Sequence, residues 1–160
     1  MKSTATPKLA KRLRLEKHKE GGYFKETYRS ETTIDIEGYE GRRNIATAIY
    51  YMLARNDFSA FHRIKSDEIW HHYAGGTVTL YAIDKDGRLS KTRMGKNGAF
   101  QVVIKAGTWF AAALESKRSY CLLGCTVSPG FDYRDWEIGK RDDLVRMYPQ
   151  HRKIIERYTK

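Results

Sequence analysis

Apolar and polar residues alternate in short runs along most of the chain, and turn residues interrupt the pattern about every eight to twelve positions. The pairs Asp86-Gly87 and Asn97-Gly98 are strong signals of β-hairpins. Short alternating segments at this spacing are typical of an antiparallel sandwich or barrel. The pattern predicts strands over residues 23–36, 45–53, 59–63, 68–73, 77–83, 89–94, 100–105, 108–114 and 120–127.

One of these segments is ambiguous. Residues 45–53 are apolar almost throughout, so their periodicity fits either a buried strand or a helix. The neighbouring segments all have the character of strands, and we therefore interpret this run as a strand as well.

Helical spacing is confined to the two ends of the chain. Leu9 and Leu13 fall on one face of a predicted helix over residues 7–16, and the tail from Arg141 is helical with a break at Pro149. A length of 160 residues fits one domain. We predict a single mostly β domain over residues 1–160, composed of a basic N-terminal helical segment (1–19), a β-barrel (20–139) and a C-terminal helical tail (140–160).

The positive charge is concentrated in the terminal segments. The formal net charge is +11, of which residues 1–19 contribute +6, residues 140–160 contribute +4 and the 120 residues between them only +1. Charge runs of this kind usually mark solvated helix faces, and docking on phosphates is the alternative. The sequence has neither the spacing of a zinc finger nor the glycine-and-aromatic motif of an RNA-binding module. We expect no specific nucleic-acid partner.

Nothing in the sequence points to a membrane or to an oxidising compartment. No apolar run approaches the roughly 18 residues that cross a bilayer, and the N-terminus lacks the apolar core of a signal peptide. Cys121 and Cys125 would lie roughly 13 Å apart on a regular strand, too far for an unstrained disulfide. We interpret both as small core residues and expect a cytoplasmic protein without a membrane partner.

Candidate chemistry is concentrated in the segment SAFHRIKSDEIWHHYAGG. Because side chains alternate along a strand, Glu68, Trp70 and His72 share one face and His71 lies on the other. His62, from the preceding strand, is placed to join them. Two imidazoles and a carboxylate suit either metal coordination or acid–base catalysis. The alternative is a set of hydrogen-bonded polar groups in the core or at its rim.

The same segment resembles the first motif of the cupin superfamily, which has two histidines, a glutamate and a glycine at fixed spacing. His62 matches the first histidine, Glu68 the glutamate and Gly75 the glycine, whereas Ile64 stands where the second histidine belongs. The resemblance implies a cupin barrel, that is, a jelly-roll double-stranded β-helix.

The segment GAFQVVIKAGTWF resembles the second cupin motif, with one extra residue of spacing. Gly98 and Gly107 match its glycines, Lys105 replaces its proline, and Phe110 stands at the position of its metal-binding histidine. Two of the four usual ligand positions are therefore apolar. We expect no metal or other cofactor; if a divalent metal is bound, His62, Glu68 and His72 are its candidate ligands.

A narrower resemblance covers about residues 8–148. The segments EGGYFKETYRS, KAGTWFAAA and GCTVSPGFDYRDWE are similar to those of a group of single-domain bacterial and fungal cupins of unknown function. The group is similar in fold to dTDP-sugar 3,5-epimerases, whose catalytic histidine matches His62 and whose early glycine-aromatic-aromatic-x-glutamate segment resembles residues 22–26. No motif locates the tyrosine of those enzymes or the acidic partner of their histidine. The resemblance implies a homodimer, and residues 23–36 are long enough to reach a partner subunit.

These observations lead to one main hypothesis for function. The protein is expected to bind a small polar ligand, of sugar or nucleotide-sugar type, in the barrel and to act on it as an isomerase or epimerase. His62 would be the general base, Glu68 would orient it, and His72 would line the pocket. The expected ligand-binding residues are Tyr23, Glu26, Trp70, Trp109 and Phe110, although such aromatic residues are more often core. The alternatives are a non-catalytic binding cupin and a metal-dependent cupin enzyme.

Overall fold

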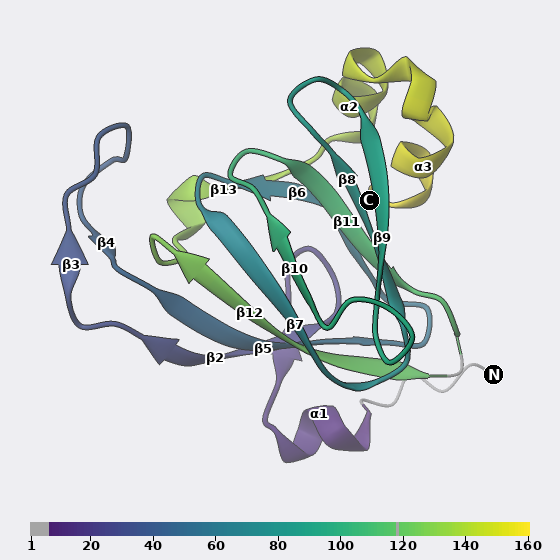
Figure 1. Ribbon diagram of the computed structural model, residues 1–160, viewed down its shortest axis with the longest axis horizontal. Helices are drawn as coiled ribbons and strands as arrows, with labels where there is room; N and C mark the ends of the chain where they lie inside the picture. Colours follow the sequence, from purple (N-terminus) through teal and green to yellow (C-terminus); the bar gives the residue numbers. More distant parts are fainter. Residues whose placement is uncertain (1–6, 118) are drawn as a thin grey trace.

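Two antiparallel sheets lie face to face and enclose the core (Figure 1). The structure is a computed structural model that describes residues 7–117 and 119–160, so residues 1–6 of the predicted N-terminal segment lie outside the described residues. The larger sheet has the order β1 (Glu16–Lys17), β2 (Tyr23–Arg29), β5 (Thr47–Ala54), β12 (Tyr120–Ser128), β7 (Asp67–Gly75) and β10 (Gln101–Ile104). The smaller sheet has the order β13 (Trp136–Ile138), β6 (Phe58–Ile64), β11 (Trp109–Leu114), β8 (Val78–Ile83) and β9 (Leu89–Met94). The predicted mostly β fold is confirmed, and the ambiguous run over residues 45–53 is a strand.

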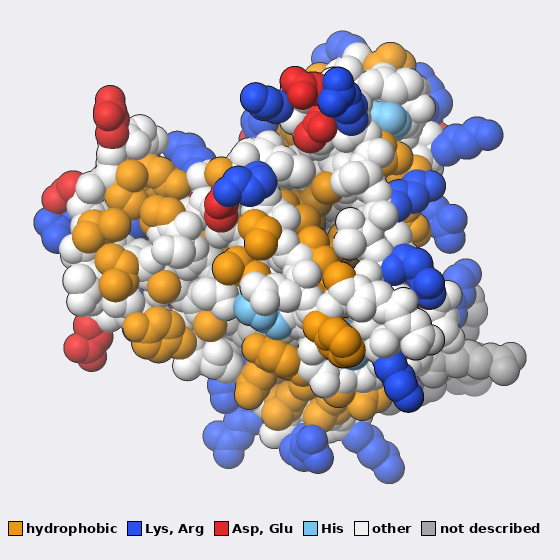
Figure 2. Space-filling view, in the orientation of Figure 1, with side chains coloured by type: hydrophobic (Ala, Val, Ile, Leu, Met, Phe, Trp, Pro, Cys, Tyr) orange, Lys and Arg blue, Asp and Glu red, His pale blue; other side chains and the backbone are white. Residues whose placement is uncertain are grey.

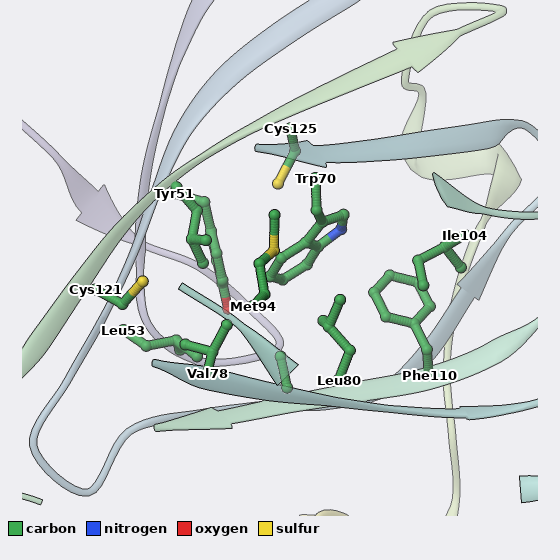
Figure 3. Close-up of a cluster of buried hydrophobic side chains, with 12 residues drawn as sticks. Tyr51, Leu53, Trp70, Val78, Leu80, Met94, Ile104, Phe110, Cys121 and Cys125 are labelled. Atoms are coloured by element: carbon green, nitrogen blue, oxygen red, sulfur yellow. The ribbon is translucent and has the colours of Figure 1, made fainter. Parts of the chain in front are cut away.

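The core between the sheets is built from the inward faces of the central strands (Figure 3). Strand β12 turns Cys121, Leu123 and Cys125 inward, where they pack with Trp70 of β7 and Phe110 of β11. Both cysteine thiols are unbridged and buried, in agreement with their interpretation as core residues.

Helices cover the outer face of the smaller sheet (Figure 1). The tail forms α2 (Arg141–Met147), the 3₁₀ turn η2 (Pro149–His151) and α3 (Arg152–Arg157), with the predicted break at Pro149. Leu144 and Ile155 of these helices are fully buried against Phe61, Ile83 and Trp109. Trp109 therefore belongs to this outer layer and not to the interior of the barrel. No helix in the described part of the chain is long and apolar enough to cross a membrane.

The N-terminal helix is shorter than the sequence pattern predicts. Helix α1 spans only Lys8–Arg12, because Arg14 adopts a positive φ of 55° that cannot continue a right-handed helix. The next residues form β1, which pairs with the edge of β2. If α1 continued as a longer helix, the backbone groups at the edge of β2 would have no strand to pair with. Pairing with β1 satisfies them. Leu9 and Leu13 pack beside Tyr23, on the outside of the barrel.

The predicted strand over residues 23–36 is divided into two strands. β2 pairs with β5, but the chain then leaves the sheet and forms a hairpin of β3 (Thr33–Ile34) and β4 (Arg43–Asn44). This hairpin projects from the body of the molecule (Figure 1). We call residues 30–44 the arm.

A buried ion pair holds the base of the arm against the barrel. Arg43 Nε and Nη2 donate to the two carboxylate oxygens of Asp135 at 2.6 and 2.9 Å, and neither side chain is more than 5% exposed. Asp135 ends the 3₁₀ turn η1 (Tyr133–Asp135), which precedes β13. The pair therefore connects the arm to a segment that lines a cavity in the barrel.

Replacement of Arg43 by alanine should destabilise the fold, because it leaves the buried carboxylate of Asp135 without its partner. We expect a loss of roughly 3–5 kcal/mol in the free energy of unfolding, measured by urea denaturation. Arg42, the preceding residue, makes an exposed pair with Asp35, so Arg42→Ala should cost about 0–1 kcal/mol. Equal losses in the two variants would show that burial does not set the strength of the Arg43 pair.

The outer face of the larger sheet carries exposed apolar side chains beyond the part that α1 covers. Tyr73, Phe100 and Val103 are each at least half exposed, and Ile34 and Ile45 are exposed on or beside the arm. Figure 2 shows hydrophobic side chains over the arm and over the neighbouring strands. Exposed apolar patches are a common feature of interaction sites. A second copy of the chain, with its arm reaching across, fits both the surface and the expected homodimer.

We predict that the protein sediments at twice the chain mass of 18.6 kDa at micromolar concentration. Val103→Glu should shift it to the monomer, because it places a charge in the apolar contact. Lys153→Glu changes the charge of an exposed position on α3, over the smaller sheet, and should leave the dimer intact. A wild-type protein that sediments as a monomer would contradict this assignment.

Candidate functional site

A cavity of about 340 Å³ lies inside the barrel, within the size range of small-molecule sites. Its walls come from the segment before β2, from β2, β5, β6, β7 and β12, and from the stretch that contains η1 and β13. Its lining combines aromatic rings with carboxyl and imidazole groups: His18, Glu20, Phe24, Glu26, Arg29, Thr47, Ile49, Tyr51, His62, Ile64, Glu68, Trp70, Cys125, Val127, Phe131, Asp132, Tyr133 and Trp136.

Two glycines place Glu20 inside the barrel. Gly21 and Gly22 have φ values of +124° and +70°, in the region that favours glycine. A Cβ atom on Gly21 would lie 2.0 Å from the backbone oxygen of Phe58, and one on Gly22 would lie 2.7 Å from that of Met52. The chain can therefore make this close turn only with glycine at both positions, and the turn leaves Glu20 only 5% exposed.

The Glu20 carboxylate is surrounded by hydrogen-bond donors. Ser59 Oγ donates to Oε1 at 2.8 Å, and Trp136 Nε1 donates to Oε2 at 3.4 Å. His62 Nε2 lies 3.1 Å from Oε2. Hydrogen bonds to a carboxylate favour its ionised form, and these donors surround Glu20 deep in the cavity.

Both ring nitrogens of His62 are engaged. Nδ1 lies 2.7 Å from the carbonyl oxygen of Ala60, which can only accept, so Nδ1 carries a proton. Nε2 faces Glu20, and one proton must lie between these two groups for the contact to be a hydrogen bond. The imidazole packs against Phe110, with ring centroids 4.2 Å apart. Acid–base chemistry at this point therefore belongs to the Glu20–His62 pair and not to His62 alone.

His18 stands on the other side of Glu20. Its Nδ1 accepts the backbone N–H of Glu20 at 3.3 Å and lies 3.6 Å from Oε2 of the same residue. Aromatic rings surround it, with Phe24 edge-on at 4.7 Å and Tyr133 stacked at 6.4 Å. Burial lowers the pKa of His18, and the carboxylate of Glu20 only partly offsets this effect. His18 is thus a neutral hydrogen-bonding group at neutral pH.

Glu68, on β7, is the second deeply buried carboxyl group of the cavity. Burial raises its pKa to about 8, and the nearby charge of Glu20 acts in the same direction. The indole of Trp70 and the thiol of Cys125 lower it slightly. Glu68 makes no ion pair with any residue that the structure describes, so it is protonated at neutral pH. One cavity therefore holds two glutamates in opposite environments.

Charged groups nearer the surface are paired with each other. Arg29 donates to both carboxylate oxygens of Glu26 at 2.9 and 2.7 Å and to the carbonyl oxygen of Phe131 at 3.1 Å. Asp132 caps η1 and accepts from the guanidinium of Arg134, which lowers the pKa of that carboxyl. These pairs compensate the charges of Glu26, Arg29 and Asp132 in the outer part of the cavity.

The cavity brings together four of the residues that the sequence singled out: Glu26, His62, Glu68 and Trp70. It does not include His72. The register between β7 and β12 is regular from Glu68 to His72 and shifts only beyond His72, so the cause is position along the strand: the His72 ring lies beside Phe100, with Nε2 3.3 Å from the carbonyl oxygen of Gly76. The expectation that His72 shares the pocket of His62 is therefore wrong.

Three expected ligand-binding aromatics also lie outside the lining. Tyr23 packs on the outside of the barrel with Lys17 over its ring at 3.8 Å, because its face of β2 meets α1. Trp109 lies under the C-terminal helices with Arg63 over its ring, since its position in β11 faces away from the core. Phe110 faces the core and supports the ring of His62 from behind. Tyr23 and Trp109 therefore do not line this cavity, and a role of either in ligand binding stays a prediction.

Sequence reasoning missed the most polar part of the site, His18 and Glu20, and also the aromatic walls Tyr51, Tyr133 and Trp136. A signal for the first two was present in the sequence, because Glu20 directly precedes the Gly21-Gly22 pair and His18 lies two positions before Glu20. The acidic partner of His62 is therefore Glu20, which comes from a segment 42 positions earlier in the chain.

The donor set does not fit the usual metal centre of this fold. Ile64 and Phe110 occupy two of the expected ligand positions, and among residues 7–117 and 119–160 no three His, Cys, Asp or Glu side chains are grouped to hold a metal ion. His72, one of the three alternative ligands, lies outside the cavity. We therefore derive no step through a metal, and the absence of a bound metal in the purified protein stays a prediction.

Protonation of Glu68 should make stability depend on pH. The folded protein keeps this proton up to a pKa of about 8, whereas the unfolded chain loses it near the ordinary value of 4.5. The free energy of unfolding should therefore fall as the pH rises between about 4.5 and 8 and then level off. Since one pKa unit corresponds to about 1.4 kcal/mol, the expected fall is a few kcal/mol.

Urea denaturation between pH 5 and pH 9 measures this dependence. Glu68→Gln, which stays neutral, should flatten the curve, and Glu137→Gln, at an exposed position, should leave it as in the wild type. An unchanged pH dependence in Glu68→Gln would contradict the assignment of the buried proton to Glu68.

Comparison with known proteins gives a consistent result. Residues 7–139 match the family described as "Cupin superfamily (DUF985)". The uncharacterized protein YML079W of Saccharomyces cerevisiae is 33% identical over 149 residues, which cover 82% of this chain and 74% of the yeast protein. The crystal structure of protein SO0799 from Shewanella oneidensis has a TM-score of 0.86 at 35% identity and covers 95% of each chain. A hypothetical protein from Leishmania major has a TM-score of 0.84 at 34% identity and covers 94% of this chain and 96% of its own. The family match, which covers most of the chain, and the shared barrel show that this protein belongs to the cupin superfamily, in its DUF985 family.

Proposed function

We propose that this cupin binds a small polar molecule, of sugar or nucleotide-sugar type, in the barrel cavity and catalyses a proton transfer on it, as an isomerase or epimerase does. One observation carries the proposal: Glu20 and Glu68 line the same cavity in opposite environments. Two titratable groups held in contrasting environments of one cavity are the usual arrangement of an acid–base site.

The Glu20–His62 pair is the proton acceptor of the proposed reaction. Glu20 is held by Ser59, Trp136 and His62, which fix its position within the cavity. His62 is itself fixed by the carbonyl oxygen of Ala60 and by the ring of Phe110. A rigid base in a largely apolar cavity needs little rearrangement when the proton moves.

Glu68 is the proton donor. It is a neutral carboxylic acid near pH 7, because burial and the charge of Glu20 both disfavour its ionised form. The aromatic walls, Trp70, Tyr51, Tyr133 and Trp136 among them, present rings on which a sugar or a base can stack. The cavity therefore combines a base, an acid and stacking surfaces.

A non-catalytic binding cupin is the second candidate, and one observation favours it. Both nitrogens of His62 and both oxygens of Glu20 already have partners within the protein, as a purely structural polar network would. In that case the same cavity binds a ligand without turning it over. The two candidates differ in whether a carbon-bound hydrogen of the ligand exchanges with solvent.

Solvent exchange tests the proposal directly. The protein is incubated in D₂O with ketoses, aldoses and nucleotide-linked keto sugars, and proton NMR follows the loss of carbon-bound hydrogen. We expect exchange in at least one of these compounds, and Glu20→Gln should slow it by about 100-fold or more, the ordinary contribution of a general base. The amide has the size of the carboxylate and can keep contacts with Ser59 and His62, so this variant should fold.

Glu137→Gln is the matched control and should exchange at the wild-type rate, because Glu137 lies on the surface paired with Arg63. Exchange that persists in Glu20→Gln would contradict the role of the pair as base. A compound that binds in the cavity without exchange, with no exchange in any other compound, would favour the non-catalytic cupin.

A further inference from the structure

A second cavity, of about 380 Å³, lies where the turn between β5 and β6, the loop after β11 and the end of α3 meet. The two cavities have no lining residue in common within the described part of the chain. The volume of the second cavity is within the range of small-molecule sites. This cavity is therefore a candidate binding site that is separate from the barrel cavity.

Three basic side chains line the second cavity, and they come from three separate segments. Arg55 lies in the β5–β6 turn, Lys117 in the loop between β11 and β12, and Arg157 at the end of α3. The only carboxyl group among the described lining residues is Asp57, and Lys17 pairs with it at 3.5 Å. Lys117 and Arg157 make no ion pair with any residue that the structure describes. Positive charge therefore exceeds negative charge along the described wall.

Backbone hydrogen bonds hold these segments against one another. The N–H of Arg55 donates to the carbonyl oxygen of Ser119 at 2.9 Å, which ties the β5–β6 turn to the loop that carries Lys117. The N–H of Phe61 donates to the carbonyl oxygen of Tyr158 at 2.8 Å, which ties the end of α3 to β6. The basic side chains therefore start from fixed points around the cavity, and this lowers the cost of ordering them on a ligand.

The wall of the second cavity also has an apolar part. The rings of Phe58 and Tyr158 meet edge to face with their centroids 5.6 Å apart, and Leu114 lines the same cavity. Phe58 is only partly buried, so its ring is open to contact with a ligand. A cavity that combines cations with an apolar wall suits an organic anion, because it holds both the charge and the carbon part.

We propose that the second cavity binds a small organic phosphate. A phosphate monoester has three acceptor oxygens and close to two negative charges near neutral pH, so it matches three cations better than a carboxylate does. The guanidinium groups of Arg55 and Arg157 can each hold two phosphate oxygens, and the ammonium group of Lys117 adds a point charge. The organic group lies against Phe58. This inference does not rest on the proposed function of the barrel cavity.

Two other interpretations of these basic residues fit less well. A solvated helix face carries its charges along one element, whereas these three residues come from segments that are distant in sequence. A nucleic acid needs cations along an extended groove, whereas these three line one small cavity. Arg55 and Lys117 also belong to residues 20–139, whose net charge is only +1, so a generally basic composition does not explain why they lie together.

Binding of phenyl phosphate, measured by isothermal titration calorimetry at pH 7.5, tests this site without a known ligand. The wild type should bind it at least about tenfold more tightly than benzyl alcohol, which keeps the ring but carries no charge. It should also bind it more tightly than inorganic phosphate, which lacks the ring. The affinity should fall as the salt concentration rises, because the cations lie near the surface.

Matched variants locate the binding. Arg55→Gly and Arg157→Gln each remove one cation and should each weaken binding by about tenfold or more. Glycine suits the left-handed φ of 60° at position 55, so Arg55→Gly should fold. Arg14→Gly is its control, since Arg14 has a φ of 55° and does not line the second cavity. Arg152→Gln, on the same helix as Arg157 but outside the lining, is the control for Arg157→Gln.

Both controls should bind phenyl phosphate as the wild type does. Glu20→Gln should do so as well, because Glu20 lies in the barrel cavity. Its result separates failure of the proposed acid–base function from failure of the phosphate site. In ¹H–¹⁵N NMR spectra, the amide resonances of residues 55–58 should move when phenyl phosphate binds to the wild type.

Three outcomes would overturn the inference. One is a wild type that binds phenyl phosphate no more tightly than benzyl alcohol or inorganic phosphate, a result that includes the absence of any binding. Another is a folded Arg55→Gly variant that binds phenyl phosphate as tightly as the wild type does. The third is an equal loss of affinity in Arg14→Gly and Arg55→Gly, because the anion would then bind the basic surface as a whole, as a nucleic acid would.

Discussion

The cavity depends on the burial of one carboxylate. Removing Glu20 from water is costly unless donors replace the water molecules, and the donors come from segments that are distant in sequence. Ser59 and His62 lie on β6, and Trp136 lies on β13. A backbone contact also holds this segment, because the carbonyl oxygen of Glu20 accepts a hydrogen bond from the N–H of Ala60. The requirement to satisfy this single group thus joins the N-terminal segment to the smaller sheet and closes one side of the barrel.

The same burial explains the chemical asymmetry of the cavity. Once Glu20 is ionised and surrounded by donors, its charge acts on the second carboxyl group nearby, and burial adds to the effect. Glu68 then remains neutral near pH 7. The polar groups Glu20 and His62 therefore meet between the N-terminal segment and β6. At two positions where cupin motifs usually have metal-binding histidines, this chain has the apolar residues Ile64 and Phe110.

The periphery of the molecule supports the site from outside. The arm is connected through Arg43 and Asp135 to η1, whose Tyr133 forms part of the cavity wall. The C-terminal helices cover the outer face of the smaller sheet, so β6 and β11 are packed on both sides. His62 and Phe110 consequently sit on strands with little freedom to move, which is the condition for a positioned acid–base group.

The sequence by itself determined the class of fold and most of its strands, because alternation and turn residues act locally. It identified His62, Glu68, Trp70 and Glu26, which tertiary structure then brought to one cavity. It also predicted the break in the C-terminal helical tail at Pro149, because proline cannot continue a regular helix.

The tertiary structure alone decided which residues complete the site. Alternation assigned His72 to the face of Glu68, but the cavity ends before it reaches His72. Tyr23 and Trp109 are as aromatic as the cavity walls, yet each faces a helix on the outside of its sheet. Glu20 meets His62 only because the Gly21-Gly22 turn places a distant segment against β6. Local patterns specify which face of a strand a side chain occupies, but contacts between distant segments decide what that face meets.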